Sequence, residues 1–275
     1  MNPVVPVIGR VASAINGLGL WNREQQVWGH RMRARTFDRT LYLWMHRRGF
    51  MGAAERAVLS RIVKPGMTVI DVGANLGLYS LLLAGLVGPK GRVVSFEPDP
   101  ELFSLLRENC AANGASVDAR RVALGLSSNR MILQRLTLNS GDNHLGATNR
   151  TAFRRPLEVE VAAFDTLMPG LRPDFIKVDV QGWELKVLRG MEATLRASQD
   201  VLVYLEFWPS GLRRAGDSPA ELFAFLRGLG LQLYSCADWR DLDEGSFLAL
   251  EGHVRGMNHV DLLAARKRPP STGGS

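Results

Sequence analysis

The sequence predicts an α/β fold built on a doubly wound, mostly parallel sheet. Two observations carry this prediction: short runs rich in β-branched residues alternate with apolar segments of helical length, and Gly or Pro residues separate them. Such alternation is typical of parallel crossover connections. The chain has 275 residues, 46% hydrophobic and 22% charged, which suffices for one domain with a core. A disordered chain and a disulfide-bonded miniprotein are excluded.

The first half of the expected sheet lies between residues 67 and 113. Pro65-Gly66 interrupts the chain just before the first apolar run, and the Gly88–Gly91 turn ends the first apolar helix. The expected elements are a strand at Met67–Val72, a helix at Leu76–Val87, a strand at Arg92–Glu97 and a helix at Glu101–Asn113.

The second half repeats the order of strand, helix and strand. These elements are expected at Asp174–Asp179, Gly182–Gly190 and Val201–Glu206, followed by closing strands at Leu231–Tyr234 and Val260–Ala264. The intervening stretch differs, because three strand-like segments surround a polar segment, Thr137–Arg155. Those segments are Val117–Val122, Arg130–Leu136 and Leu157–Ala163.

The first strand ends in the turn Asp71-x-Gly73-x-Asn75-x-Gly77, at the sheet edge where α/β proteins bind ligands. Glycine lets a backbone turn sharply and approach a ligand closely, and the Asp71 carboxylate can accept from a donor-rich group. A dinucleotide-binding turn would carry glycines at positions 73, 75 and 78, whereas this chain has Asn75 and Leu78. The alternative is an ordinary strand–helix turn.

The second strand ends at Glu97, which Pro98 follows. A carboxylate in this place can accept hydrogen bonds from both hydroxyls of a ribose. Alone, Glu97 would be interpreted as a surface turn residue. Together with the turn after Asp71, it favours a ribose-binding role.

Three motifs resemble those of the FkbM-type S-adenosylmethionine-dependent methyltransferases, over about residues 55–235. The motifs are the turn from Asp71 to Gly77, Phe96-Glu97-Pro98, and Ile176-Lys-Val-Asp-Val-Gln-Gly-Trp-Glu184 followed by Val187-Leu-Arg-Gly190. The resemblance implies a Rossmann-like class I methyltransferase fold with S-adenosylmethionine as cofactor. It also implies that Asp71, Gly73, Asn75 and Gly77 surround the amino-acid part of the cofactor and that Glu97 holds its ribose. The chain departs from the family's Asp-x-Glu-Gly pattern at Gln181, which replaces the Glu.

The resemblance further implies O-methylation of a hydroxyl on a small molecule such as a sugar, a glycolipid or a secondary metabolite. A hydroxyl acceptor must lose a proton, which a histidine or a carboxylate can take. The candidates are His144, Asp179 and Glu206, although a solvated loop histidine and two strand-end capping residues are the alternatives. An NAD or nucleotide-sugar enzyme, or an inactive binding module of the same fold, is the alternative function.

Other ligands are not expected. Asp179 and Glu206 with Asn143 offer oxygen ligands for Mg²⁺ or Ca²⁺, but the resemblance implies no metal. Nucleic acid is not expected, because the basic segment has few aromatic residues and lacks a known binding motif.

The net charge of +7 comes from the N-terminal part of the chain. Residues 1–64 hold eleven basic and three acidic residues, whereas the rest has a balance of −1. We expect a basic helical extension over residues 1–51, a methyltransferase domain over 52–268 and a disordered tail over 269–275. The extension could dock on the domain, which we favour, or make peripheral contact with an anionic membrane.

A cytoplasmic location is expected. The chain has two cysteines far apart in the sequence, which is typical of a reducing compartment. No run reaches the roughly 18 apolar residues of a membrane-spanning helix.

Overall fold

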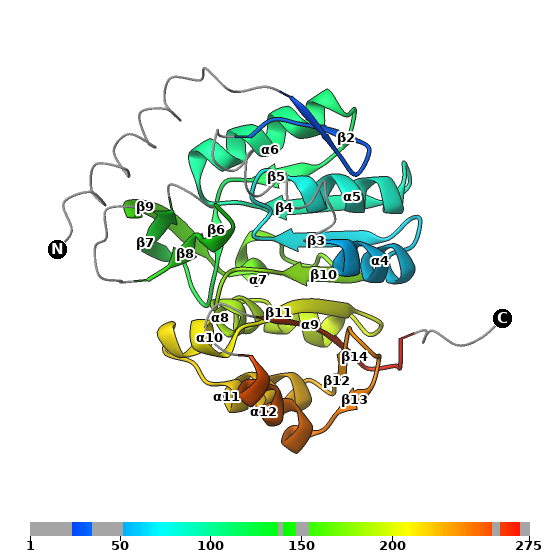
Figure 1. The fold of residues 1–275 in the computed structure, drawn as a ribbon, viewed down its shortest axis with the longest axis vertical. Helices are drawn as coiled ribbons and strands as arrows, with labels where there is room; N and C mark the ends of the chain where they lie inside the picture. Colours follow the sequence, from blue (N-terminus) through cyan, green and yellow to red (C-terminus); the bar gives the residue numbers. More distant parts are fainter. Residues whose placement is uncertain (1–23, 35–51, 137–139, 147–153, 255–258, 270–275) are drawn as a thin grey trace.

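An eight-stranded sheet forms the centre of the molecule, in the order β13-β12-β14-β11-β10-β3-β4-β5 (Figure 1). The structure is a computed structural model and describes residues 24–34, 52–136, 140–146, 154–254 and 259–269. The strands are β3 (Thr68–Val72), β4 (Arg92–Phe96), β5 (Asp118–Arg120), β10 (Phe175–Val178), β11 (Leu202–Phe207), β12 (Gln232–Ser235), β13 (Asp241–Leu242) and β14 (Val260–Ala265).

Five neighbouring strands of this sheet, β5, β4, β3, β10 and β11, are parallel. Strand β14 lies between β11 and β12 and is antiparallel to both, and β13 is antiparallel to β12. The mostly parallel α/β fold predicted from the sequence is therefore confirmed. The parallel strands all end at one edge, which brings their carboxyl ends together.

Helices cover both faces of the sheet, because alternate residues of each strand point to opposite sides. Val69 belongs to the same hydrophobic cluster as Leu59 and Leu83 on one face, whereas Ile70 belongs to the cluster of Leu188 and Leu226 on the other. The first layer contains α4 (Ala53–Ile62), α5 (Leu78–Val87) and α6 (Pro100–Ala112). The second contains α7 (Phe164–Leu167), α8 (Glu184–Arg189), α9 (Glu192–Ala197), α10 (Pro209–Arg214), α11 (Pro219–Gly228) and α12 (Glu244–His253).

A small second sheet, ordered β6-β9-β7-β8, is inserted between β5 and β10. Its long antiparallel pair is β7 with β9, running from Asn129 opposite Val161 to Leu136 opposite Arg154. Figure 1 shows this sheet in green beside the end of the main sheet. Its elements are β6 (Ala123–Leu124), β7 (Asn129–Leu136), the 3-10 helix η2 (Ser140–Asp142), β8 (His144–Leu145) and β9 (Arg154–Ala162).

The described part of the N-terminal extension is a β-hairpin and not the expected helix. Strands β1 (Gln25–Val27) and β2 (His30–Met32) are joined by Trp28 and Gly29, whose φ angles are 53° and 86°. Two consecutive residues with positive φ form the tight turn that suits a two-residue hairpin. The rest of residues 1–51 and residues 270–275 lie outside the described ranges. Among the described helices, none has the length and apolar character needed to cross a bilayer.

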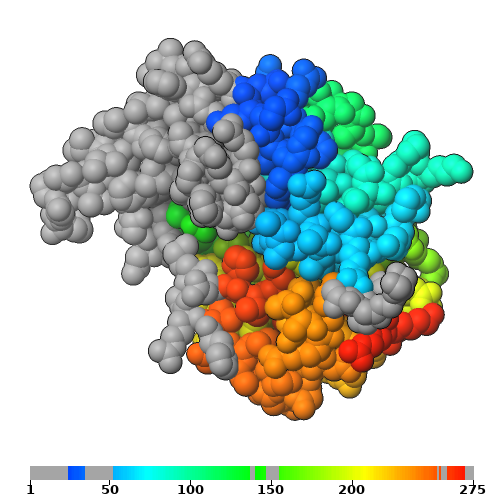
Figure 2. All heavy atoms as spheres, turned by 45° about the vertical axis from the view of Figure 1, so that its right-hand side comes forward, coloured from blue at the N-terminus to red at the C-terminus, as the bar shows by residue number. Residues whose placement is uncertain are grey.

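The hairpin docks on α6 through two asparagine side chains. The backbone N–H of Arg33 donates to Asn109 Oδ1 at 2.7 Å, and Asn109 Nδ2 donates back to the Arg33 carbonyl at 2.9 Å. Asn113 makes the same pair of bonds with Arg31, at 2.9 and 2.8 Å. In Figure 2 the hairpin, in dark blue, lies directly beside the green surface of α6. The backbone along the β2 edge is thus hydrogen-bonded to the side-chain amides of Asn109 and Asn113, which lie one turn apart on α6.

Replacing Asn109 by Ala should destabilise the fold by about 1–3 kcal/mol, the cost of leaving buried partners unpaired. The Asn109 side chain is fully buried, and its Nδ2 also donates to the Leu76 carbonyl at 2.8 Å. Urea unfolding measures the change. Ser104→Ala, an exposed change on the same helix, is the control and should be neutral. Equal midpoints for the two variants would contradict the prediction.

Candidate functional site

A pocket lies at the carboxyl ends of β3, β4 and β10, and three parts of the chain form its walls. They are the turns after β3 and β4 (Gly73, Asn75, Glu97, Pro98), the loop after β10 (Asp179, Gln181, Trp183) and the inserted segment (Ser140, Asn143, His144, Leu145). Five residues predicted from the sequence therefore line one cavity. They are Gly73, Asn75, Glu97, His144 and Asp179.

The turn after β3 fits tightly between its neighbours. Gly73 has φ +84°, and a Cβ atom there would lie 1.9 Å from the Asp179 carbonyl oxygen. Gly77 has φ +91°, and a Cβ there would lie 2.6 Å from Leu106 of α6. Glycine is therefore required at both positions, by the backbone conformation and by the space. Gly77 packs under the turn, and Gly73 faces the pocket.

Glu97 is held in one orientation by two backbone donors. Its Oε2 accepts from the Asn75 N–H at 2.8 Å, and its Oε1 accepts from the Asp99 N–H at 2.9 Å. The side chain is buried but lines the pocket. Because a carboxylate oxygen has a second lone pair, both oxygens can still accept from a ligand hydroxyl.

Asp71 lies beneath the pocket and not at its edge, where the sequence predicted it. Strand alternation places its side chain on the same face as Val69, towards α5. There its Oδ2 accepts from the Ser80 hydroxyl at 2.6 Å, and its Oδ1 lies 4.0 Å from Lys177 Nζ. Burial raises the pKa of Asp71, and this outweighs the opposing effects of Lys177 and Ser80.

Lys177 is a buried cation that links the carboxylates of two strands. Its Nζ donates to Asp179 Oδ2 at 3.0 Å and lies 4.6 Å from the centre of the Tyr79 ring. Burial alone would lower the pKa of Lys177, but the charges of Asp179 and Asp71 outweigh it and raise the pKa. The sequence interpretation missed Lys177, although a lysine inside an otherwise apolar strand is a signal for a buried ion pair.

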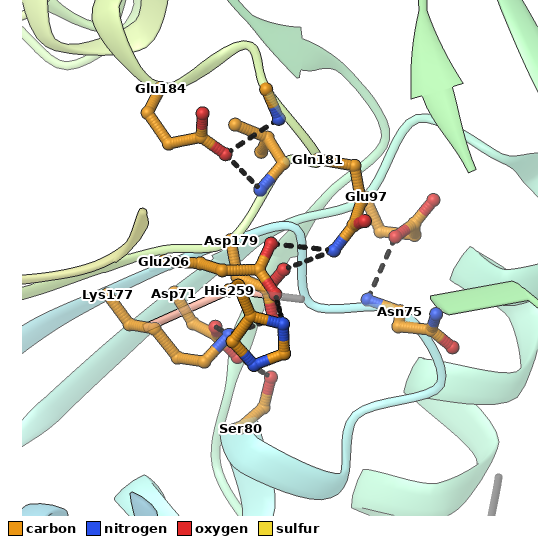
Figure 3. A network of polar contacts seen from close by, with 12 residues as sticks. Asp71, Asn75, Ser80, Glu97, Lys177, Asp179, Gln181, Glu184, Glu206 and His259 are labelled. Carbon is orange, nitrogen blue, oxygen red and sulfur yellow. Dashed lines mark hydrogen bonds and ion pairs between the residues drawn. The ribbon is translucent and has the colours of Figure 1, made fainter. Parts of the chain in front are cut away.

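Gln181 joins the two carboxylates predicted as catalytic (Figure 3). Its Nε2 donates to Asp179 Oδ1 at 3.2 Å and to Glu206 Oε2 at 2.8 Å. Its φ of 55° turns the chain, and its carbonyl accepts from Arg214 at 2.7 Å. Gln181, at the position where the resemblance would place a Glu, therefore does more than remove an acid, because an amide supplies two donors where a third carboxylate would be repelled.

The loop that carries Gln181 is fixed from behind by Gly182 and Glu184. A Cβ on Gly182 would lie 2.3 Å from the carbonyl carbon of Gly211, so the loop packs backbone to backbone on α10. Glu184 accepts from the Gly182 N–H at 2.9 Å. Burial and the nearby Glu206 raise the pKa of Glu184 to about 8.

Glu206 forms an ion pair with His259, a residue that the sequence interpretation missed. His259 Nδ1 lies 2.9 Å from Glu206 Oε1, and its side chain is 35% exposed. Burial, then Asp179, raises the pKa of Glu206 to about 7, and the hydrogen bond to Glu206 raises the pKa of His259 to about 9. Asp179 differs, since Lys177 and the hydrogen bonds from Lys177 and Gln181 outweigh burial and lower its pKa.

His144 lies on the inserted wall of the pocket. Its Nδ1 is 2.9 Å from the Asp142 carbonyl oxygen, which can only accept, so Nδ1 carries the hydrogen. In the neutral ring Nε2 is then the acceptor nitrogen. The neighbouring Asn143 accepts from the Leu136 N–H at 2.8 Å, and its Nδ2 has no hydrogen-bond partner within the described ranges.

The pocket has the chemical groups that S-adenosylmethionine requires. The fixed Glu97 carboxylate can take ribose hydroxyls, and Asp179 can take an ammonium group. Within the described part of the chain, the buried Asn143 Nδ2 is a donor that has no hydrogen-bond partner. The apolar part of the wall suits an aromatic base; it consists of Pro98, Leu102, Val122 and Leu124. Among the residues that the structure describes, no three His, Cys, Asp or Glu side chains are grouped to hold a metal.

Comparison with known proteins identifies one protein family, whose model matches more than half of the chain. Residues 71–233 match the family model described as the methyltransferase FkbM domain. The chain is 29% identical over 133 residues to the hexuronic acid methyltransferase AglP of Haloferax volcanii, covering 48% of this chain and 53% of that protein. It is also 29% identical over 179 residues to methyltransferase sdnD of Sordaria araneosa, covering 53% and 68%.

The chain thus spans from about half to about two thirds of the length of these two relatives. Among solved structures, a TehB-like SAM-dependent methyltransferase from Corynebacterium glutamicum aligns with a TM-score of 0.45 and 12% identity. The alignment covers 84% of this chain and 98% of that one.

Proposed function

This chain belongs to the FkbM methyltransferase family, whose cofactor is S-adenosylmethionine, and we propose that it methylates a hydroxyl group of a small molecule. One observation carries the proposal. One wall of the pocket, formed by Glu97 and the turn after β3, has the groups expected to bind the cofactor. Another wall contains Gln181, whose amide donates to both Asp179 and Glu206. A hydroxyl acceptor needs this combination, because it must be aligned with the methyl donor and must lose a proton.

In this proposal the cofactor is held by Glu97 and Asp179, with Gly73 and Asn75 forming the turn beneath it. When bound, S-adenosylmethionine supplies an activated methyl group on a positively charged sulfur. Asp71 lies below the pocket, where it accepts a hydrogen bond from the Ser80 hydroxyl and faces Lys177. Lys177 in turn donates to Asp179 and holds it in place. Asp71 is thus a positioning residue.

Among the three candidates we favour Glu206 as the proton acceptor; it does not line the pocket itself but accepts a hydrogen bond from Gln181, which does. Asp179 is a weak base, because its pKa is lowered by Lys177 and by its hydrogen bonds. Glu206 has a pKa of about 7, which suits a base at neutral pH. His144 occupies the opposite wall and remains the competing candidate, to be separated by mutation.

The acceptor is proposed to be a sugar, a glycolipid or another secondary metabolite. The relative from Haloferax volcanii is named for its action on hexuronic acid. Carboxylates and amides in the pocket wall here, such as Asp179, Gln181 and Asn143, are suited to recognising hydroxyl groups. Methyl incorporation from labelled cofactor, screened over monosaccharides, uronic acids and phenolic metabolites, tests this class.

Replacing Glu97 by Ala should weaken the binding of S-adenosylhomocysteine by about ten- to a hundredfold. This is the loss expected for hydrogen bonds to a charged group, about 1.5–3 kcal/mol. Isothermal titration calorimetry measures the change. Glu101→Ala, an exposed acid at the start of α6, is the matched control and should bind as wild type does.

The same titration tests the family cofactor against the alternative functions. NAD should produce no binding heat under conditions in which S-adenosylmethionine and S-adenosylhomocysteine bind. Binding of NAD, or equal affinity of wild type and Glu97→Ala for S-adenosylhomocysteine, would overturn the proposed site.

A further inference from the structure

The side-chain amide of Gln181 uses both of its donor hydrogens on two carboxylates. Its Nε2 donates to Asp179 Oδ1 at 3.2 Å and to Glu206 Oε2 at 2.8 Å. The second oxygen of Asp179 lies 3.0 Å from Lys177 Nζ, and the second oxygen of Glu206 lies 2.9 Å from His259 Nδ1. Each carboxylate is thus an acceptor in an ion pair of its own. Because an amide nitrogen carries two hydrogens, Gln181 has no further side-chain donor to offer.

These contacts also fix which way the amide faces. The oxygen and the nitrogen of a glutamine side chain can exchange places by a half turn, and the hydrogen-bond network decides between the two positions. After such a turn the Gln181 oxygen would face two carboxylate oxygens, and both hydrogen bonds would be lost. Figure 3 shows the amide nitrogen turned towards Asp179 and Glu206. The amide oxygen, Oε1, is therefore directed away from both acids.

Oε1 is the polar atom that this side chain presents to the pocket. Gln181 lines the pocket and is half-buried, and no donor in the described residues contacts Oε1. The backbone of the residue is held in place as well, because its carbonyl accepts from Arg214 Nη2 at 2.7 Å. An amide oxygen has lone pairs and no hydrogen. A ligand group that contacts Oε1 must therefore be a hydrogen-bond donor.

The place of Gln181 favours the methyl acceptor over the cofactor as the source of that donor. Glu97 and Asp179 are already suited to the ribose hydroxyls and the ammonium group of the cofactor. The apolar wall suited to its base includes Pro98 and Leu102, which follow β4. Gln181 follows β10, and β3 separates β10 from β4 in the sheet. The donor groups of the cofactor thus have partners elsewhere in the pocket.

We propose that Gln181 Oε1 accepts the hydrogen bond of the hydroxyl group that is methylated, so that this one atom makes the site prefer a hydroxyl over its methyl ether. The inference rests on the proposed function and assigns the recognition of the acceptor to a single oxygen. Gln181 binds and orients the O–H group, and the proton is taken by a separate base. After methyl transfer the product has no O–H, so this hydrogen bond is lost and the product should bind more weakly than the acceptor.

The test compares the binding of an acceptor with the binding of its own methyl ether. The probes are a compound that wild type methylates, found by the screen over monosaccharides, uronic acids and phenolic metabolites, and the ether isolated from that reaction. Both are titrated calorimetrically into protein saturated with S-adenosylhomocysteine, which has no methyl group to transfer. We expect wild type to bind the hydroxyl compound about two- to tenfold more tightly than the ether, the effect of one uncharged hydrogen bond.

Two substitutions separate the oxygen of Gln181 from its donors. Gln181→Met has a side chain of similar length without Oε1, so its preference for the hydroxyl compound should disappear. Gln181→Glu loses both donors but keeps an accepting oxygen, so its preference should remain. If Gln181 only held Asp179 and Glu206 together, both variants would lose the preference alike. Gln199→Met makes the first change at an exposed position and should behave as wild type does.

The affinity for S-adenosylhomocysteine decides between the two ligands of the pocket. Gln181→Met should bind S-adenosylhomocysteine as wild type does, and a loss of at least tenfold would assign Oε1 to the cofactor and overturn the inference. Equal binding of hydroxyl compound and ether by wild type would overturn it without the use of any variant. In both cases methyl transfer by wild type, and with it the proposed function, would stand. If wild type methylates no compound of the screen, the proposed function fails and the inference fails with it.

Discussion

Replacing Glu206 by Gln should lower the rate of methyl transfer by about 10²–10⁴-fold, the usual loss when a general base is removed. The affinity for S-adenosylhomocysteine should change little, because the side chain at position 206 does not line the pocket. The introduced Gln also keeps an oxygen that can accept the hydrogen bond from Gln181. Wild-type turnover should rise as the pH passes through the range below and around 7, because Glu206 must lose its proton to act. In Glu206→Gln this rise should be absent.

The measurement is turnover against pH for wild type, Glu206→Gln and His144→Ala, with an acceptor found by screening. His144→Ala is the matched comparison, since it removes the competing candidate from the opposite wall. A rate that falls only in His144→Ala would assign the proton to that residue. If both variants keep the wild-type rate and pH profile, the acceptor loses its proton without help and catalysis rests on alignment.

The largest effect on stability is expected for Lys177→Met. The lysine is 3% exposed and faces two carboxylates, Asp179 at 3.0 Å and Asp71 at 4.0 Å. Removing it leaves both acids without their buried cation, which should destabilise the fold by about 3–5 kcal/mol near neutral pH. Urea unfolding measures the loss. In the variant, the pKa values of the two acids are raised above their unfolded values, so the loss should shrink as the pH falls and they become protonated.

Lys267→Met is the control for this prediction. Lys267 also has an acidic partner, Asp200 at 2.7 Å, but both side chains are exposed, at 83% and 70%. Such surface pairs contribute little, so its unfolding midpoint should match wild type. The double variant Lys177→Met with Asp71→Asn should recover part of the lost stability. Equal effects of the two lysine substitutions, or no recovery in the double variant, would contradict the role assigned to Lys177.

The strands that position the site could be predicted from the sequence because each is a short apolar run with breakers beside it. The strand expected at Arg92–Glu97 is β4, Arg92–Phe96, and the strand expected at Val201–Glu206 is β11, Leu202–Phe207. Parallel strands end at one edge, so the residues that follow them lie close together. Gly73, Asn75, Glu97 and Asp179 therefore line one pocket.

Other parts of the site depend on strand order and on the direction of side chains. His259 reaches Glu206 because β14 is antiparallel to β11, with Phe207 opposite Val260. A local sequence motif does not indicate which distant strand will pair with β11. Asp71 belongs to the right motif, but strand alternation turns it under α5. The hairpin around Trp28 was missed because a basic segment was interpreted as a helix, although Trp28-Gly29 marks a tight turn.

The side-chain pairing of β2 has a consequence for synthesis on the ribosome. The partners of the hairpin, Asn109 and Asn113, follow Arg33 and Arg31 by 76 and 82 residues. At about 5–20 residues per second, these partners are made roughly 4–16 s after the hairpin itself. During that interval the edge of β2 and the ring of Trp28 lack the helices that cover them in the finished domain. Until α6 folds, the apolar hairpin residues Val27 and Met32 therefore stay without the cluster that buries them in the finished domain.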